Sequence, residues 1–287
     1  MKKIRIFATA LLLAFTLSSC ESFFDVELDD QAKIEDIFRQ KTEVQKYLSH
    51  LYSYIPQEEE VVGMHGWTVG RADESLFSWY QWVYYTQFRT GNYSSATTNF
   101  NYWPDYYIGI NQCSIFLKYI DLDKEDTPAT LAYMKAEARF LRAYFYWIAL
   151  DVFGDVPFTT ETSPFGGGVN PKQASRKDVF DYCISELTDL ASDESAMPAA
   201  RSNYPRADKG AVNGLLARMY LNAEVYAGTP MWTEAKSACE AIFGMGYSLC
   251  PEYSDLFRGD NGENADALKE IIFGVAYDAE QMQSYGG

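Results

Sequence analysis

The chain has 287 residues, a formal net charge of −16, and aromatic residues at 16% of its length. A surface this negative repels phosphate backbones, which argues against nucleic-acid binding and favours uncharged or cationic partners. The length is sufficient for one large hydrophobic core or two modest ones.

The N-terminal residues have the layout of an export signal. Three basic residues precede an apolar run over residues 6–17, and small residues then lead to Cys20. This run is shorter than the about 20 apolar residues that cross a bilayer, so we predict a cleaved signal peptide over residues 1–19. The sequence Leu-Ser-Ser-Cys at residues 17–20 matches a bacterial lipobox and predicts that Cys20 is lipidated. The alternative is ordinary cleavage beside an incidental cysteine.

Lipidation of Cys20 would hold the mature chain on a membrane without crossing it. Each buried methylene of an acyl chain contributes about 0.8 kcal/mol, so several chains on one cysteine make a firm anchor. We therefore predict one mature helical domain, residues 20–287, at the membrane surface.

Apolar residues recur at helical spacing in several segments along the chain. The predicted helices cover about residues 33–55, 103–120, 134–152, 179–197, 209–223 and 232–243. Pro56 is expected to end the first of them. Residues 61–104 lack a clear period and mix aromatic rings with glycines and a Ser/Thr/Asn cluster, which is typical of long loops.

The third of these helices carries apolar residues on more than one face. One stripe consists of Met134, Ala138, Leu141, Phe145, Ile148 and Val152, and a neighbouring stripe consists of Phe140, Tyr144, Trp147 and Asp151. Two stripes predict a helix that is contacted on two sides, as in stacked helical hairpins. Gly154 suits the left-handed position after a helix, and Pro157 forbids continuation.

The helix pattern predicts an all-α fold of stacked pairs with long aromatic-rich loops. Leu216, Ala217, Tyr220 and Ala235 match tetratricopeptide positions in part, although the loop between their helices is longer than in that repeat. The stretch KEIIFGVAYD, residues 269–278, has the composition of a strand. Nothing in the sequence supplies a partner for this strand, so we expect the chain to be part of a longer fold.

Four cysteines remain once Cys20 is assigned to lipid. Cys113, Cys183 and Cys239 each fall on an apolar stripe of a predicted helix, where a free cysteine behaves as a small hydrophobe. We therefore favour buried thiols for these three. Together with Cys250 they allow three disulfide pairings, between which the sequence does not choose. Their spacing does not fit a zinc site.

Several segments of the chain together resemble the SusD/RagB family of outer-membrane nutrient-binding lipoproteins. The central match is AEARFLRAYFY at residues 136–146, which runs into FGDVP at residues 153–157. Flanking matches are FFDVELDDQ after Cys20, Arg176 before VFDYCISELTDLA, RADKGAV at residues 206–212 leading to LARMYL, WTEA at residues 232–235 through Leu249, and EIIF at residues 270–273. These segments cover nearly the whole chain in the order of the family.

The resemblance implies tetratricopeptide-like helix pairs tethered to the outer leaflet of the outer membrane and facing the cell exterior. It also implies a partner, a SusC-like TonB-dependent outer-membrane transporter, to which such proteins hand glycans or, in some members, peptides. Members of the family continue well beyond this length, so the resemblance implies a further C-terminal part.

The aromatic-rich loop supplies a candidate sugar-binding platform. Saccharides present apolar C–H faces and many hydroxyls, so a binder combines exposed rings with a few hydrogen-bonding groups. The candidate ligand-binding residues within residues 65–93 are Trp67, Arg71, Asp73, Glu74, Trp79, Trp82, Tyr84 and Tyr85. The alternative is that most of these rings fill the core between helices.

Catalytic and cofactor motifs are missing from the sequence, so we predict a binding protein without cofactor or metal. We find no nucleophile elbow, HExxH or phosphate loop. Asp121–Asp126 begins like a calcium loop but lacks its glycine and its final glutamate. His50 is expected at the surface, and His65 lies in the aromatic loop. Peptide capture, a glycoside hydrolase subunit and a pure helical scaffold remain as alternatives to glycan binding.

Overall fold

The computed structural model describes residues 33–55, 90–92, 103–164 and 170–276. Contacts divide the chain into two units, residues 1–37 and 38–287. The first unit contributes the short helix α2, Ile34–Ile37, to the described residues. All further elements belong to the second unit.

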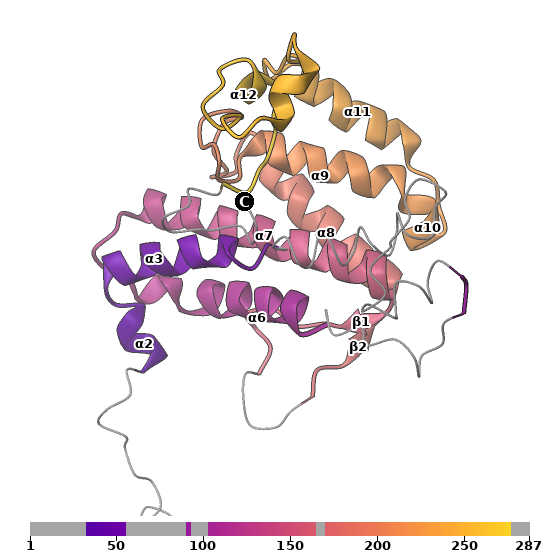
Figure 1. Ribbon diagram of the computed structural model, residues 1–287. Coiled ribbons are helices and arrows are strands. Elements are labelled where there is room, and N and C mark those ends of the chain that lie inside the picture. Colours follow the sequence, from indigo (N-terminus) through magenta and orange to yellow (C-terminus); the bar gives the residue numbers. More distant parts are fainter. Residues whose placement is uncertain (1–32, 56–89, 93–102, 165–169, 277–287) are drawn as a thin grey trace, which may run out of the picture. The chain divides into compact units, whose positions relative to one another are not determined.

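The second unit is built from helices that lie against one another in chain order (Figure 1). They are α3 (Lys41–Tyr52), α6 (Trp103–Tyr119), α7 (Pro128–Phe153), α8 (Arg176–Ala191), α9 (Lys209–Leu221), α10 (Ala223–Ala227), α11 (Trp232–Phe243) and α12 (Ala267–Glu270), with short 3₁₀ turns at Ile120–Leu122 and Tyr253–Phe257. Helix α6 packs on α7, α7 on α8, α8 on α9 and α9 on α11, while α3 contacts both α6 and α7. The predicted mainly helical fold of stacked pairs is confirmed. None of the described helices is long and apolar enough to cross a bilayer.

Helix α7 is the centre of this stack because it is buried on most of its circumference. Thr127 caps its start by accepting a hydrogen bond from the Thr130 amide, and Pro128 follows. Gly154, at φ 79°, closes its end by donating to the Leu150 carbonyl. The buried positions are the first predicted stripe apart from Val152, Phe140 of the second stripe, and also Ala136, Glu137, Arg142, Ala143, Tyr146, Ala149 and Leu150. The helix is therefore contacted on more faces than the two predicted stripes indicate.

The close approach of α6 to α7 depends on Gly109. A Cβ atom at this position would lie 2.9 Å from ring atoms of Phe145, whose side chain is fully buried. A contact that short would force one partner to move. Glycine at position 109 thus gives the Phe145 ring its place between the two helices.

A small two-stranded sheet lies between the end of α7 and the start of α8, and the sequence FGDVP forms the turn that leads into it. Strand β1 (Val156–Pro157) pairs antiparallel with β2 (Gln173–Ala174). The Asp155 carboxylate accepts a hydrogen bond of 2.8 Å from the Arg176 amide at the start of α8. Because an acceptor at a helix start satisfies an otherwise unpaired amide, Asp155 fixes α8 relative to this turn. The sequence did not predict this small sheet.

Some predicted helix ends were wrong. The predicted helix over residues 33–55 is interrupted at Gln40, whose backbone is extended (φ −110°, ψ 111°). Helix α8 ends at Ala191, well before Met197, because the Ser192 and Ser195 hydroxyls donate to the carbonyls of Asp189 and Leu190 and close its last turn.

The predicted strand at residues 269–278 is also wrong over its described part. Helix α12 includes Lys269 and Glu270, and residues 271–276 form neither helix nor strand. The Phe273 ring lies 5.4 Å from the ring of Phe140 and 6.1 Å from that of Tyr144, as centroid distances. The apolar side chains of this segment are thus used against α7 rather than in a sheet, and no strand among the described residues pairs with it.

The cysteines follow the prediction with one exception. Cys113 and Cys183 are free and fully buried, and burial raises the pKa of Cys113 to about 12. Cys250 is also free and buried. Cys239 is exposed, contrary to the prediction, because α11 turns Ala235, Ala238 and Ile242 inward instead. No disulfide joins the cysteines of the described segments.

Candidate ligand-binding site

All eight predicted ligand-binding residues lie outside the described residues, within positions 56–89. They are Trp67, Arg71, Asp73, Glu74, Trp79, Trp82, Tyr84 and Tyr85. Cys20 and His65 also lie outside the described residues. The structure describes a different place with the chemistry of a ligand site, namely a groove along α7.

This groove, which we call the α7–α9 groove, has a volume of about 410 Å³. Helix α7 contributes Phe140, Tyr144 and Trp147, helix α9 contributes Ala211, Gly214, Leu215 and Arg218, and the third wall is Glu270–Phe273. The volume falls in the range of small-molecule sites, which are mostly apolar clefts with a few polar groups. Three segments that are distant in sequence therefore form one cavity of suitable size.

Aromatic rings form a continuous wall of the groove. The centroid of Tyr144 lies 5.6 Å from that of Trp147 and 6.1 Å from that of Phe273. Phe140 completes the row through its contact with Phe273. Tyr144 and Trp147 are half-buried, so part of each ring remains accessible from the groove. An accessible row of rings is the surface on which apolar faces of ligands stack.

Polar groups at the groove are available for a ligand. The guanidinium of Arg218 lies 5.9 Å from the centroid of Trp147, and the Arg218 side chain is exposed. Neither this guanidinium nor the Tyr144 hydroxyl hydrogen-bonds to another part of the chain that the structure describes. Burial raises the pKa of Tyr144, and the nearby charge of Arg218 opposes the rise. Glu270 accepts a hydrogen bond of 2.6 Å from the Cys250 amide with one carboxylate oxygen.

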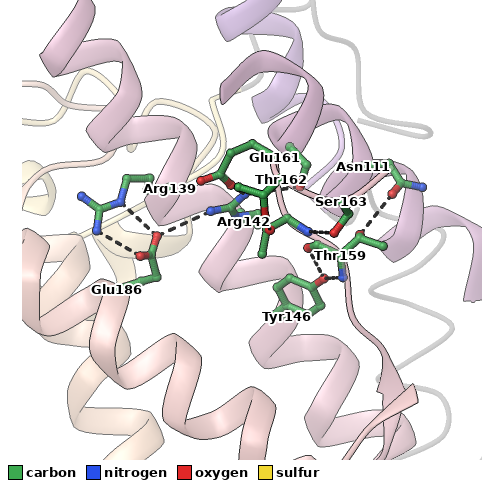
Figure 2. A network of polar contacts seen from close by, with 11 residues as sticks. Asn111, Arg139, Arg142, Tyr146, Thr159, Glu161, Thr162, Ser163 and Glu186 are labelled. Carbon is green, nitrogen blue, oxygen red and sulfur yellow. Dashed lines mark hydrogen bonds and ion pairs between the residues drawn. The ribbon is translucent and has the colours of Figure 1, made fainter. Parts of the chain in front are cut away.

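The face of α7 toward α8 carries a buried network of charges (Figure 2). Arg142, only 2% exposed, contacts the carboxylate of Glu161 and lies 3.7 Å from that of Glu186. Arg139 forms two hydrogen bonds of 2.9 and 3.0 Å to the same Glu186. Figure 2 shows both arginines directed at Glu186. The cationic and anionic groups thus neutralise each other between α7, α8 and the segment after β1.

The same network holds the segment after β1 against α7 (Figure 2). The Tyr146 hydroxyl donates to the Thr159 carbonyl at 2.7 Å and accepts from the Thr159 amide at 2.8 Å. Burial would raise the pKa of Glu161, but its hydrogen bond and charge interaction with Arg142 outweigh burial and hold that pKa below its usual range. A general acid needs a raised pKa. Glu161 is therefore a structural partner of Arg142 and unsuited to acid catalysis.

A second buried carboxylate, Glu137, joins α7 to α3 and to the turn before α9. It accepts hydrogen bonds from the Tyr52 hydroxyl and, at 2.9 Å, from Arg206 Nε. Full burial raises the pKa of Glu137, and this effect outweighs the opposing charge of Arg206 and the hydrogen bond from Tyr52. Tyr133, on the same helix, also faces this carboxylate.

The raised pKa of Glu137 makes stability depend on pH. The native state binds the Glu137 proton more tightly than the unfolded chain, so the free energy of unfolding falls as pH rises through the raised pKa. Glu137→Gln removes this titration. The advantage of wild type over the variant should therefore shrink as pH rises from about 4, near the ordinary pKa of a glutamate, through the raised pKa of Glu137. Urea unfolding of both proteins at a series of pH values measures this difference in the free energy of unfolding. A wild-type advantage that grows with pH would contradict the raised pKa of Glu137.

The acidic run at residues 121–126 serves the turn between α6 and α7. Asp121 forms an ion pair of 2.7 Å with Lys135, and Asp126 forms one of 2.7 Å with Lys41. Asp123 accepts hydrogen bonds from the amides of Glu125 and Asp126. Over the described ranges, no three His, Cys, Asp or Glu side chains gather as metal ligands.

The sequence did not predict this charged network, because the residues of α7 were interpreted as two apolar stripes. Glu137 lies between those stripes, whereas Arg139 and Arg142 lie on the side of α7 that pairs with Glu186 of α8. Charged residues are almost never fully buried unless they are paired. The charged residues within a helix that is otherwise apolar on neighbouring faces were the available signal for this network. The groove had a weaker signal, since Phe140, Tyr144 and Trp147 formed the predicted second stripe, but its third wall comes from residues distant in sequence.

Comparison with known proteins finds relatives that are described as starch-binding or glycan-binding proteins. A family model described as "Starch-binding associating with outer membrane" matches residues 22–221. The starch-binding protein SusD of Bacteroides thetaiotaomicron is 33% identical over 217 residues, which are 75% of this chain and 38% of that protein. The chain thus spans less than half of this relative.

Solved structures share the fold. A laminarin-binding SusD-like protein superposes with a TM-score of 0.70 at 21% identity, over 84% of this chain and 52% of that one. Surface glycan-binding protein A from Bacteroides thetaiotaomicron, in complex with laminarihexaose, gives a TM-score of 0.64 at 20% identity, over 83% of this chain and 49% of that one.

Proposed function

The chain belongs to the SusD-like family of outer-membrane carbohydrate-binding proteins, and we propose that it captures oligosaccharides at the cell surface. Members of this family bind carbohydrate and are not enzymes. The observation that carries the proposal for this chain is the α7–α9 groove. Its row of rings offers stacking surfaces, while Arg218 and the Tyr144 hydroxyl offer hydrogen bonds that nothing else in the described chain uses.

The proposal includes attachment to the outer membrane and a transporter partner. Cys20, at the end of the lipobox sequence, would carry the lipid. A SusC-like TonB-dependent transporter would receive the captured oligosaccharide. The description of the matching family, associating with the outer membrane, supports this location.

The aromatic loop is proposed as a second contributor to ligand binding. Trp67, Trp79, Trp82, Tyr84 and Tyr85 would supply rings, and Arg71, Asp73 and Glu74 would supply hydrogen bonds. This composition within one short segment supports the proposal, because neutral sugars need both kinds of group.

Binding measurements with matched tryptophan variants test the proposed function. Trp147→Ala removes a ring from the groove, whereas Trp232→Ala removes an exposed ring on α11 that does not line it. Loss of stacking at about 1–1.5 kcal/mol corresponds to a loss in affinity of about 10-fold. We expect wild type and Trp232→Ala to bind a polysaccharide in native affinity gels, and Trp147→Ala to bind it about 10-fold more weakly.

Circular dichroism of both variants controls for folding. Binding of oligopeptides without any binding of glycans would contradict oligosaccharide capture and would favour the peptide-binding alternative. Release of reducing ends from the polysaccharide would contradict a binding function without catalysis.

A further inference from the structure

We propose that the α7–α9 groove selects sugars that carry a carboxylate, with Arg218 as the residue that determines this specificity. The inference rests on the proposed function and names the class of glycan for that groove. It starts from the partners of the arginines in the described part of the chain.

Several of these arginines are neutralised by ion pairs within the protein. Arg139, Arg142, Arg206 and Arg258 each form an ion pair with an Asp or Glu side chain. Arg201 donates to the Gly246 carbonyl. The exposed guanidinium of Arg218 contacts the Trp147 ring and meets no carboxylate of the described residues. Arg176 also forms no ion pair with the described residues, but it lies beside Gly154 and does not line the groove. Arg218 is thus the arginine that brings an unpaired positive charge to the groove, in a chain with 40 acidic and 24 basic residues.

The position of Arg218 leaves its hydrogen-bonding edge free. A guanidinium that lies over an aromatic face is held in place by that contact, and its N–H groups still point outward in the plane of the group. This planar fork matches the two oxygens of a carboxylate better than any other anion-binding side chain does. The Tyr144 hydroxyl, close enough to Arg218 to feel its charge, adds another donor. Two neighbouring donors without acceptors favour an acceptor-rich group on the ligand.

The net negative charge of the protein opposes an acidic ligand, so a carboxylate binds only where a local positive charge offsets this repulsion. A free carboxylate is repelled by the acidic surface at large, but charges more than about 8 Å away are largely screened at physiological salt. Among the residues that line the groove, Arg218 is the basic one and Glu270 is the acidic one. Glu270 belongs to the third wall, Glu270–Phe273, and forms no ion pair with Arg218. We therefore place the carboxylate of the sugar at Arg218 and its hydroxyls toward Glu270.

A matched pair of probes isolates the contribution of the carboxylate. The first probe is a neutral oligosaccharide that binds the wild-type protein, and the second is the same oligosaccharide with its C6 hydroxymethyl groups oxidised to carboxylates. Both probes are chosen by first screening a panel of neutral and uronate-containing polysaccharides. The panel contains different glycosidic linkages, so the linkage is not fixed in advance. Affinities are measured by isothermal titration calorimetry at low and at physiological salt.

Variants at the two charged residues should act in opposite directions. Arg218→Gln removes a charge-assisted hydrogen bond and should weaken binding of the carboxylate-bearing probe about 10-fold to 100-fold. It should change binding of the neutral probe by less than about 3-fold. Glu270→Gln keeps an acceptor for the Cys250 amide and removes a negative charge, so it should strengthen binding of the acidic probe. Added salt should weaken that binding in wild type.

The outcomes separate this inference from the proposed function. The selectivity for carboxylate-bearing sugars is supported if wild type prefers acidic glycans and Arg218→Gln loses this preference. Binding of neutral glycans with equal or weaker binding of their oxidised forms overturns the selectivity and leaves oligosaccharide capture intact. Absence of binding to the whole panel overturns both. Arg218 is exposed, so circular dichroism of its variant should match wild type.

Discussion

Replacement of Phe145 by alanine is expected to lower the free energy of unfolding by about 3–5 kcal/mol, the largest effect of any single substitution considered. The ring is fully buried between α6 and α7, where Gly109 leaves only enough room for it. Removal of the ring takes away apolar burial and leaves a cavity, because two helices in a closely packed stack close the gap incompletely. Urea unfolding followed by circular dichroism measures the change.

Ile108→Ala is the matched control for Phe145→Ala. Ile108 lies next to Gly109 on α6 but is 41% exposed, so we expect its truncation to change the free energy of unfolding by less than about 0.5 kcal/mol. A loss below about 1 kcal/mol for Phe145→Ala would contradict a tightly packed interface between α6 and α7.

The second large effect is expected for Arg142→Met. Methionine keeps much of the length of the side chain but leaves Glu161 without its partner and removes one partner from Glu186. Loss of one member of a buried ion pair is destabilising by about 3–5 kcal/mol. The Glu161 side chain is 38% exposed and can regain water, so the expected loss lies near about 3 kcal/mol.

Arg139→Met provides the comparison, since its partners overlap with those of Arg142. The Arg139 side chain is 29% exposed, and its second partner, Asp189, is 62% exposed. Ion pairs near the surface contribute up to about 1 kcal/mol, so this variant should lose less than Arg142→Met does. Equal losses in the two variants, measured by the same urea unfolding, would contradict the view that burial of Arg142 organises the network.

The helical core followed from the sequence because its signals are local. The apolar spacing of α7, the glycine at position 154 and the proline at position 157 each act within one turn of the chain. Helix α11 was predicted at its observed bounds, Trp232–Phe243, for the same reason. Local patterns are sufficient wherever one helix buries one recognisable face.

The features that the sequence did not predict depend on contacts between distant segments. The pairing of Arg142 with Glu161 and Glu186 requires the turn after α7 to fold back, which no spacing rule shows. Residues 271–276 have the composition of a strand, yet they form none, and the Phe273 ring packs against Phe140 and Tyr144 of α7. Tertiary packing thus overrides local propensity.

The candidate site was predicted only in part for the same reason. The predicted platform at residues 65–93 lies largely outside the described residues and stays a prediction. The α7–α9 groove contains the predicted second stripe, but its character as a cavity comes from α9 and from Glu270–Phe273. A sequence pattern identifies an aromatic face, and only the fold shows whether another segment covers it or leaves it open.

The most direct test of oligosaccharide capture is a crystal structure of the protein grown with a glycan that the binding assays select. The account predicts electron density for a sugar ring against Trp147, with an acceptor group of the sugar within hydrogen-bonding distance of Arg218. Density for the bound glycan at another place, with none in the α7–α9 groove, would contradict it.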